Sequence, residues 1–249
     1  AYNVRNTMRS VGTRLSSLVV RHASTAMPEQ ITLCLRGSAG QSLGAFLARG
    51  IRIELLGDAN DYVGKGLSGG SIVVRPRPSS TLAPHENTII GNTVLYGATS
   101  GQLFASGQAG ERFAVRNSGA NAVVEGCGSN GCEYLTGGSV VILGEVGQNF
   151  AAGMTGGMAY LYDPSATAMS RLNTETVVAV RLASAHWEGQ VHALITQHQQ
   201  ETNSPRAAAI LADWAQHQHH FWQICPKEMI DRLAHPLSDS DETPMKRQA

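Results

Sequence analysis

Charged side chains are scarce in this chain. They make up 15% of its 249 residues, whereas an ordinary soluble domain carries roughly 25%. The 19 Lys and Arg side chains balance 19 Asp and Glu, so the basic footprint of a protein that binds nucleic acid or an anionic membrane surface is missing. We therefore expect no nucleic-acid partner and no membrane partner.

Long apolar runs and clustered cysteines are also missing. No apolar stretch approaches the ~20 residues that a membrane helix needs, and no signal-peptide core is present. Four cysteines, Cys34, Cys127, Cys132 and Cys225, are too few for a disulfide framework and are typical of free thiols in a reducing compartment. The sequence predicts a cytoplasmic location. Because it begins at Ala1 rather than Met, we expect a processed chain or a piece of a longer one.

Glycine, by contrast, is abundant and periodic. Of the 27 glycines, 25 lie within residues 37–163. The steps from Gly101 to Gly119, Gly138 and Gly157 are 18, 19 and 19 residues. A fixed period of this size predicts a solenoid, in which one turn cannot bury its apolar face alone but a stack of turns can.

Short strands should form the sides of this coil. Ile31–Leu35 alternates apolar and polar side chains, and similar segments end near Gly or Asn, so we expect strands of three to five residues joined by tight corners. Strands of neighbouring turns would pair about 4.8 Å apart. Aliphatic side chains such as Val73, Leu103, Val123 and Val141 would then stack inside the coil.

The lead-in, residues 1–30, predicts a helix. Val11, Leu15, Leu18 and Val19 fall on one helical face. This helix either covers the first turn of the solenoid, since solenoid ends need covers, or docks on an acidic surface through its arginines.

Composition changes again after the glycine-rich coil, residues 31–163. Residues 164–236 predict a helical extension whose two amphipathic helices form a hairpin, with Ser204 as N-cap and Pro205 at the first helical position. Residues 237–249 have nothing to pack and predict a disordered tail.

An insertion at residues 76–87 interrupts the repeat. Pro76, Pro78 and Pro84 cannot donate to a strand ladder, so the segment should leave the coil and run over the surface. Its role stays open between a contact loop and a tolerated insertion.

Two glycine loops, Gly64–Gly69 and Gly126–Gly131, satisfy the pattern G-x-G-x-x-G. A dinucleotide site requires such a loop to open a helix whose N-terminus holds the pyrophosphate. Strand-like residues follow both loops, and Lys65 lacks the flanking pattern of a phosphate-binding lysine. We interpret both loops as by-products of the repeat and expect no cofactor-binding residue.

Metal ligation is equally poorly supported. Cys127 and Cys132 are five residues apart with no His nearby, whereas zinc and iron–sulfur sites want closer spacings and further ligands. His217, His219 and His220 are either a weak metal patch or a solvated helix end, and only His217 and His220 would share a helical face. We expect no metal site.

Asp58 and Asp61 suggest an enzyme of a different kind. Two carboxylates held about 5–9 Å apart can cleave glycosidic bonds, so a β-helix enzyme that acts on polysaccharides is one alternative. Neighbouring turns supply no further acids, and Asp58, Asn60 and Asp61 more simply shape a corner of the backbone. We expect no catalytic residue in this chain.

Several longer segments of the sequence carry a family resemblance. Residues 57–66 (GDANDYVGKG), 90–99 (IGNTVLYGAT), 109–119 (AGERFAVRNSG) and 131–138 (GCEYLTGG) resemble the C-terminal domain of the glutamate synthase large subunit. The segment RSVGTR in the lead-in and the segment AILADW in the hairpin are similar to sequences of that family as well. Cys127 departs from the family pattern, where an apolar residue is expected.

The resemblance implies an all-β fold, a right-handed parallel β-helix of about seven turns, which agrees with the period of the glycines. It also implies a non-catalytic spacer that holds the glutaminase domain and the FMN-binding domain in register. FMN and a [3Fe-4S] cluster would be bound elsewhere in the parent enzyme, and a small FAD- and NADPH-dependent subunit of the holoenzyme is a further partner that the resemblance implies. A free-standing scaffold subunit of another multi-subunit oxidoreductase is the remaining alternative.

Overall fold

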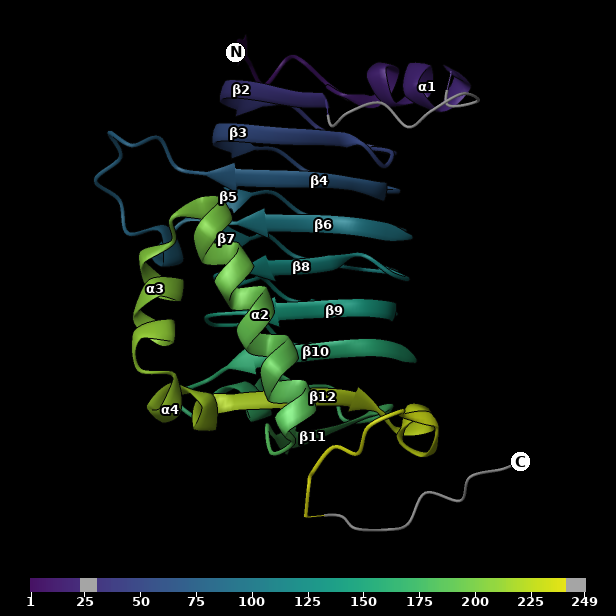
Figure 1. Ribbon diagram of the computed structural model, residues 1–249, viewed down its shortest axis with the longest axis vertical. Coiled ribbons are helices and arrows are strands. Elements are labelled where there is room, and N and C mark those ends of the chain that lie inside the picture. The colour runs from purple at the N-terminus through teal and green to yellow at the C-terminus, as the bar shows by residue number, and fades with distance from the viewer. Residues whose placement is uncertain (23–30, 241–249) are drawn as a thin grey trace.

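A computed structural model describes residues 1–22 and 31–240 of the chain. It confirms the predicted fold class, because the chain coils into a parallel β-solenoid of about seven turns. The long strands stack as parallel rungs, one per turn (Figure 1). These rungs are β2 (Ile31–Ala39), β3 (Ile51–Ala59), β4 (Ser68–Arg75), β6 (Ser100–Ala105), β8 (Asn121–Val124), β9 (Thr136–Ile142) and β10 (Gly156–Tyr162).

Two short strands, β5 (Thr88–Ile90) and β7 (Gln108–Ala109), form a second side of the coil and pair in parallel with each other. Every rung except β8 is longer than the predicted three to five residues. The first two, β2 and β3, reach nine residues because each bends at a glycine and continues around the corner. Gly57 makes this bend in β3 with a φ of +147°. A Cβ atom there would lie 2.0 Å from the carbonyl oxygen of Gly37 on the turn before, so only a bare backbone fits.

From β4 onward the apolar part of each rung is buried on both faces, and this corrects the predicted core. Leu103 does point into the coil, but Val73, Val123 and Val141 point outward, into a second apolar cluster beneath helix α2 (Ala185–Thr202). Alternation along a strand separates two faces, and in these rungs neither face is solvated, whereas β2 exposes its outer face. The residues next to these valines in each strand occupy the interior instead.

Helices α2 and α3 (Pro205–Ala212) form the predicted hairpin along the outside of the rungs (Figure 1). Ser204 caps α3 as predicted, since its Oγ accepts the N–H of Ala207 at 3.0 Å. The 18 residues of α2 span roughly 27 Å at 1.5 Å per residue. This length matches about six rungs at 4.8 Å spacing, so one helix covers most of the outer face.

Each end of the solenoid is covered. Helix α1 (Thr13–His22) lies over the first turn, where Leu15 and Val19 pack against the core, although Leu18 is exposed. Strand β1 (Tyr2–Val4) adds to the edge of β2. At the other end, β12 (Phe221–Pro226) pairs antiparallel with β10 and with β11 (Val177–Arg181).

Strands β11 and β12 lie within residues 164–236, for which we predicted helices alone. They meet a need that the local pattern does not reveal, because an uncovered last rung would expose a row of unpaired backbone groups. Helix α4 (Trp214–His217) connects the hairpin to β12 through a 3₁₀ turn.

The predicted disordered tail is wrong for residues 237–240. Leu237 packs against the cluster beneath α2, and the Asp239 carboxylate accepts the backbone N–H of Ala185 at 2.8 Å. Residues 241–249 lie outside the described part of the chain. None of the helices within the described residues is both long enough and apolar enough to cross a membrane.

Replacing Gly57 with Ala should lower the free energy of unfolding by about 2 kcal/mol or more, because the new methyl group meets backbone and cannot move away. Gly189 in α2 is the matched control, since nothing lies within 4 Å of a Cβ atom there. Its replacement by Ala should raise stability by up to about 1 kcal/mol. Urea unfolding measures both variants, and equal effects at the two glycines would contradict the close approach of the turns.

Candidate functional site

The two glycine loops form corners of the coil. As predicted, a strand rather than a helix follows each of them, β4 after the first and β9 after the second. The amide groups that would bind a phosphate are already used: Gly64 N–H donates to the carbonyl of Leu43, and Gly66 N–H to that of Tyr96, both at 2.8 Å. These loops therefore present no free cradle for a pyrophosphate.

The cysteines Cys127 and Cys132 lie inside the coil, in the apolar core. Burial raises the pKa of Cys127 to about 12 and raises that of Cys132 well above its usual value. Across residues 1–22 and 31–240, no group of three or more His, Cys, Asp and Glu side chains is arranged to hold a metal ion. The pair belongs to the packing of the core.

The histidines His217 and His220 gather around Tyr162 rather than ending in solvent. Nδ1 of His217 lies 2.7 Å from the Tyr162 hydroxyl, and the rings of both histidines pack edge-on against the tyrosine. His219 is exposed and stays apart. Two of the three are thus partly buried packing residues, which corrects the interpretation as a solvated helix end.

Asp58 and Asp61 are not brought together in one site. Asp61 lies at a corner, as predicted, and its Oδ1 accepts the backbone N–H of Asn92 at 2.8 Å. Asp58 lies within β3 rather than at the corner, and its Oδ2 accepts the hydroxyl of Ser38 at 3.0 Å. Only Asp58 lines the neighbouring cavity.

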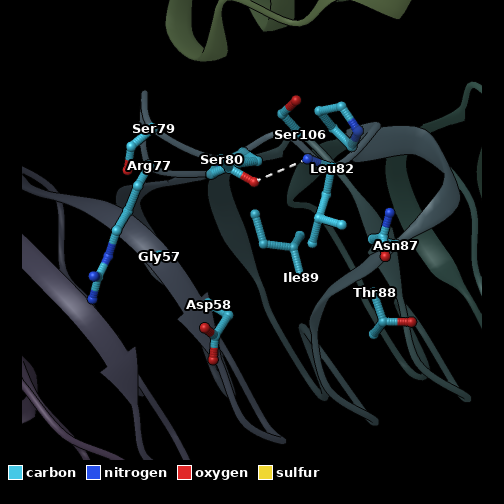
Figure 2. Close-up of a pocket in the computed structure, with 12 residues that line it drawn as sticks. Gly57, Asp58, Arg77, Ser79, Ser80, Leu82, Asn87, Thr88, Ile89 and Ser106 are labelled. Carbon is cyan, nitrogen blue, oxygen red and sulfur yellow. Dashed lines mark hydrogen bonds between the residues drawn. The ribbon is translucent and has the colours of Figure 1, made fainter.

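This cavity, of about 290 Å³, opens between β3, β5 and the insertion at residues 76–87 (Figure 2). Leu82 and Ile89 are large apolar residues of its lining, and Asp58 and Arg77 line it as well. Within the described residues, Asp58 is the one acid that lines it. A second catalytic carboxylate for glycoside cleavage is missing from this wall.

A buried polar cluster, which the sequence did not predict, lies behind the cavity. Glu125 follows β8, and its Oε1 accepts the hydroxyls of Ser106 and Ser204 and lies 3.4 Å from Nε2 of His198. All four side chains are buried, and Glu125, His198 and Ser204 are 0% exposed. Ser106 and Glu125 are one 19-residue step apart in the repeat, which was the only available signal.

Further polar contacts continue along α2. Gln190 accepts the Tyr160 hydroxyl at 2.8 Å, and Gln197 forms a paired amide contact with Gln102 at 3.0 and 3.4 Å. Near the end of the helix, Glu201 accepts hydrogen bonds from the two terminal nitrogens of the Arg52 guanidinium and raises the pKa of that group. The helix is thus attached to rungs β10, β6 and β3.

The contacts of this cluster attach the helical hairpin to the coil rather than catalyse a reaction. Glu125 is acceptor for the hydroxyl group that caps α3, so one buried carboxylate joins two turns of the coil to both helices of the hairpin. Neither Oε2 of Glu125 nor Nδ1 of His198 has a partner among the described residues. Because these atoms are enclosed, no substrate reaches them.

Comparisons with known proteins find sequences similar to this chain. The family described as "GXGXG motif" matches residues 1–227. The chain is 63% identical over 239 residues to the glutamate synthase [NADPH] large chain of Azospirillum brasilense, covering 95% of this chain and 16% of that protein. It is 50% identical over 231 residues to the ferredoxin-dependent glutamate synthase 2 of Synechocystis sp., covering 92% and 15%. It is 51% identical over 239 residues to the glutamate synthase [NADH] of Schizosaccharomyces pombe, covering 95% and 11%.

Replacing Glu125 with Ala should lower the free energy of unfolding by about 2–4 kcal/mol, because three buried partners lose their acceptor. Glu125→Gln retains one acceptor and should cost less. The exposed Glu228 is the control, and Glu228→Ala should change stability by less than about 0.5 kcal/mol. Denaturant unfolding with a helix-specific probe tests this, and a Glu125→Ala effect as small as the control would refute the role of the cluster.

Thiol titration at pH 8 should find one fast cysteine in the native chain. Cys34 is exposed and the other three cysteines are buried. Burial raises the pKa of Cys127 to about 12 and that of Cys225 to about 11, so both remain protonated and unreactive at that pH. All four should react with a disulfide reagent after unfolding, and Cys34→Ser should abolish the fast phase. A second fast thiol in the native chain would contradict the buried placement.

Proposed function

The chain belongs to the GXGXG family, and from this premise we propose that it is a non-catalytic structural part of a glutamate synthase large chain. It spans about a sixth of the length of the bacterial relatives that it matches. The activity of the whole enzyme, which would make two glutamates from glutamine and 2-oxoglutarate with two electrons from a reductant, therefore belongs to the proposal rather than to this segment.

The role we propose is to hold a glutaminase domain and an FMN-binding domain in register. A solenoid suits this task because each turn is bonded to the next through the backbone, and the turns cannot slide without breaking those bonds. The helical hairpin stiffens the stack further, since polar contacts attach α2 to several rungs.

One observation carries the proposal that this segment is non-catalytic: the groups that would do chemistry are used by the fold. The Gly64 and Gly66 amides bond to neighbouring turns, Asp61 bonds to backbone, and Glu125 is enclosed. The residues also do not fit the implied cofactors. An iron–sulfur cluster needs several accessible thiolates, whereas Cys127 and Cys132 are buried in the core, and FMN would need free donors for its phosphate.

The relatives carry different electron donors in their names. One is an NADPH enzyme, one is ferredoxin-dependent and one is an NADH enzyme, yet this segment is 50–63% identical to all three. A segment common to enzymes with different donors fits a role that does not involve the donor. The proposal therefore leaves the donor to other domains, or to a small FAD- and NADPH-dependent subunit, in a cytoplasmic enzyme.

The alternatives receive less support. A polysaccharide-acting enzyme would need Asp58 and Asp61 in one site, and only Asp58 lines the cavity. A scaffold subunit of an unrelated oxidoreductase is disfavoured because these relatives are themselves named glutamate synthases.

The purified chain should show neither glutaminase activity nor flavin absorbance. Stoichiometric flavin, or glutamine hydrolysis above a heat-treated blank, would refute the non-catalytic role. In the full-length large chain, loosening the hairpin with Glu125→Ala should raise the amount of glutamine hydrolysed per glutamate formed, because the two domains lose register. An unchanged ratio in a folded variant would count against the spacer role, and Glu228→Ala is again the control.

A further inference from the structure

No helix or strand among the described residues covers one edge of the solenoid. This edge is made of six corners, each six residues long, at residues 41–46, 61–66, 92–97, 111–116, 129–134 and 148–153. The hairpin covers the rungs, α1 covers the first turn and β12 covers the last rung. This corner edge is a side of the coil that a partner could contact.

The backbone of the corner edge is fixed. In every corner the second, fourth and sixth residues have positive φ. Their N–H groups donate to carbonyls of the neighbouring turns, as Phe46 does to Lys65 at 2.7 Å and Arg116 does to Glu133 at 2.9 Å. Side chains on this edge are therefore presented from a rigid frame, which lowers the entropy lost on binding.

Bulky residues occupy positions where glycine would be free of strain. The sixth position holds Gly66, Gly97 and Gly153 in three corners, but Phe46 (φ +56°) and Tyr134 (φ +53°) in two others. Large side chains are uncommon in this left-handed region, and such strain gathers at functional sites. Each ring lies against the glycine of the next corner, Phe46 on Gly66 and Tyr134 on Gly153, and both side chains are about half exposed.

Exposed aromatic side chains concentrate here. Among the described residues, five Phe or Tyr side chains are more than a third exposed, and four of these are on the corner edge. They are Phe46 (54%), Tyr62 (37%), Tyr96 (37%) and Tyr134 (48%). Tyr, Phe and Arg are the residues enriched in the buried centres of protein interfaces.

A hollow of about 460 Å³ lies between two of these aromatics. Tyr62 and Tyr96 form its sides, and Lys65 and Arg112 line it together with small polar side chains. No acid is among the described residues that line it, but Arg112 already forms an ion pair with Glu133 at 3.0 Å. Lys65 is the lining cation without an ion-pair partner among the described residues, and with two neighbouring phenol groups it can hold a carboxylate beside Arg112.

We propose that the corner edge is the surface on which the rest of the large chain docks, with an acidic side chain of that chain in the Lys65–Arg112 hollow and apolar side chains over Phe46 and Tyr134. This rests on the proposed function. Most of each relative lies outside the region matched by this chain, which covers 16% of the Azospirillum protein. Because the hollow is lined by cations, charge complementarity favours an acidic segment from the rest of the large chain as its occupant.

Photo-crosslinking in the full-length large chain tests the surface directly. Tyr96→p-benzoylphenylalanine should cross-link to a peptide of the same large chain that lies outside this segment. Reversing the charge of the hollow with Lys65→Glu and Arg112→Glu should cut the cross-link about tenfold, the loss expected when a close charge pair becomes a repulsion. Arg77→Glu, on the exposed insertion, is the matched control and should leave the yield unchanged.

Three results would overturn the proposal: no cross-link at Tyr96, a cross-link only to a second copy of this segment, or a yield that charge reversal does not alter. Circular dichroism of each variant separates loss of docking from loss of folding. Glutamate synthesis from glutamine and 2-oxoglutarate is measured on the parent chain in parallel. Synthesis without the cross-link rejects the docking surface alone, whereas the cross-link without synthesis rejects the proposed function alone.

Discussion

Backbone hydrogen bonding between successive turns is the constraint on which this structure depends. Each rung and each corner satisfies its N–H and C=O groups on the turns before and after it. Turns can approach this closely only where side chains are small or absent, as at Gly57, whose added Cβ would meet the Gly37 carbonyl at 2.0 Å. The scarcity of charge and the abundance of glycine are two consequences of one requirement.

The same constraint explains the elements that do not belong to the repeat. A stack that bonds only to its neighbours leaves a first and a last turn unsatisfied. Strand β1 and helix α1 cover the beginning, and β12, running against the direction of the rungs, covers the end. The outer face of the rungs is apolar, so the hairpin of α2 and α3 covers it, attached by the buried carboxylate of Glu125. Any other placement of the hairpin would leave the buried partners of Glu125 without their acceptor, which disfavours other arrangements.

Motif matches within a repeat need to be judged by where their backbone groups go. The glycine loop at residues 64–69 has the spacing of a nucleotide loop, but its Gly64, Gly66 and Ser68 amides donate to carbonyls of neighbouring turns. The carboxylate of Asp61 likewise bonds to the backbone of Asn92. Residues whose type suggests chemistry form hydrogen bonds within the coil here. The surfaces that remain are suited to contact with other domains.

The periodic spacing of glycines was enough, by itself, to predict the solenoid and its approximate period. Amphipathic spacing with the Ser204 cap predicted the helical hairpin, and segments such as residues 57–66 carried the family resemblance, because all of these are local patterns along the chain. Tertiary structure alone decided which side of each rung faces inward, since alternation defines two faces and cannot say which is the interior when both are buried, as Val73 and Val123 show. It alone revealed β11 and β12, whose pairing meets a need at the end of the stack. It alone joined Glu125 to His198, 73 residues away, and set Tyr62 beside Tyr96 on the corner edge. Contacts between distant residues depend on how the turns stack, and no local pattern in the chain records them.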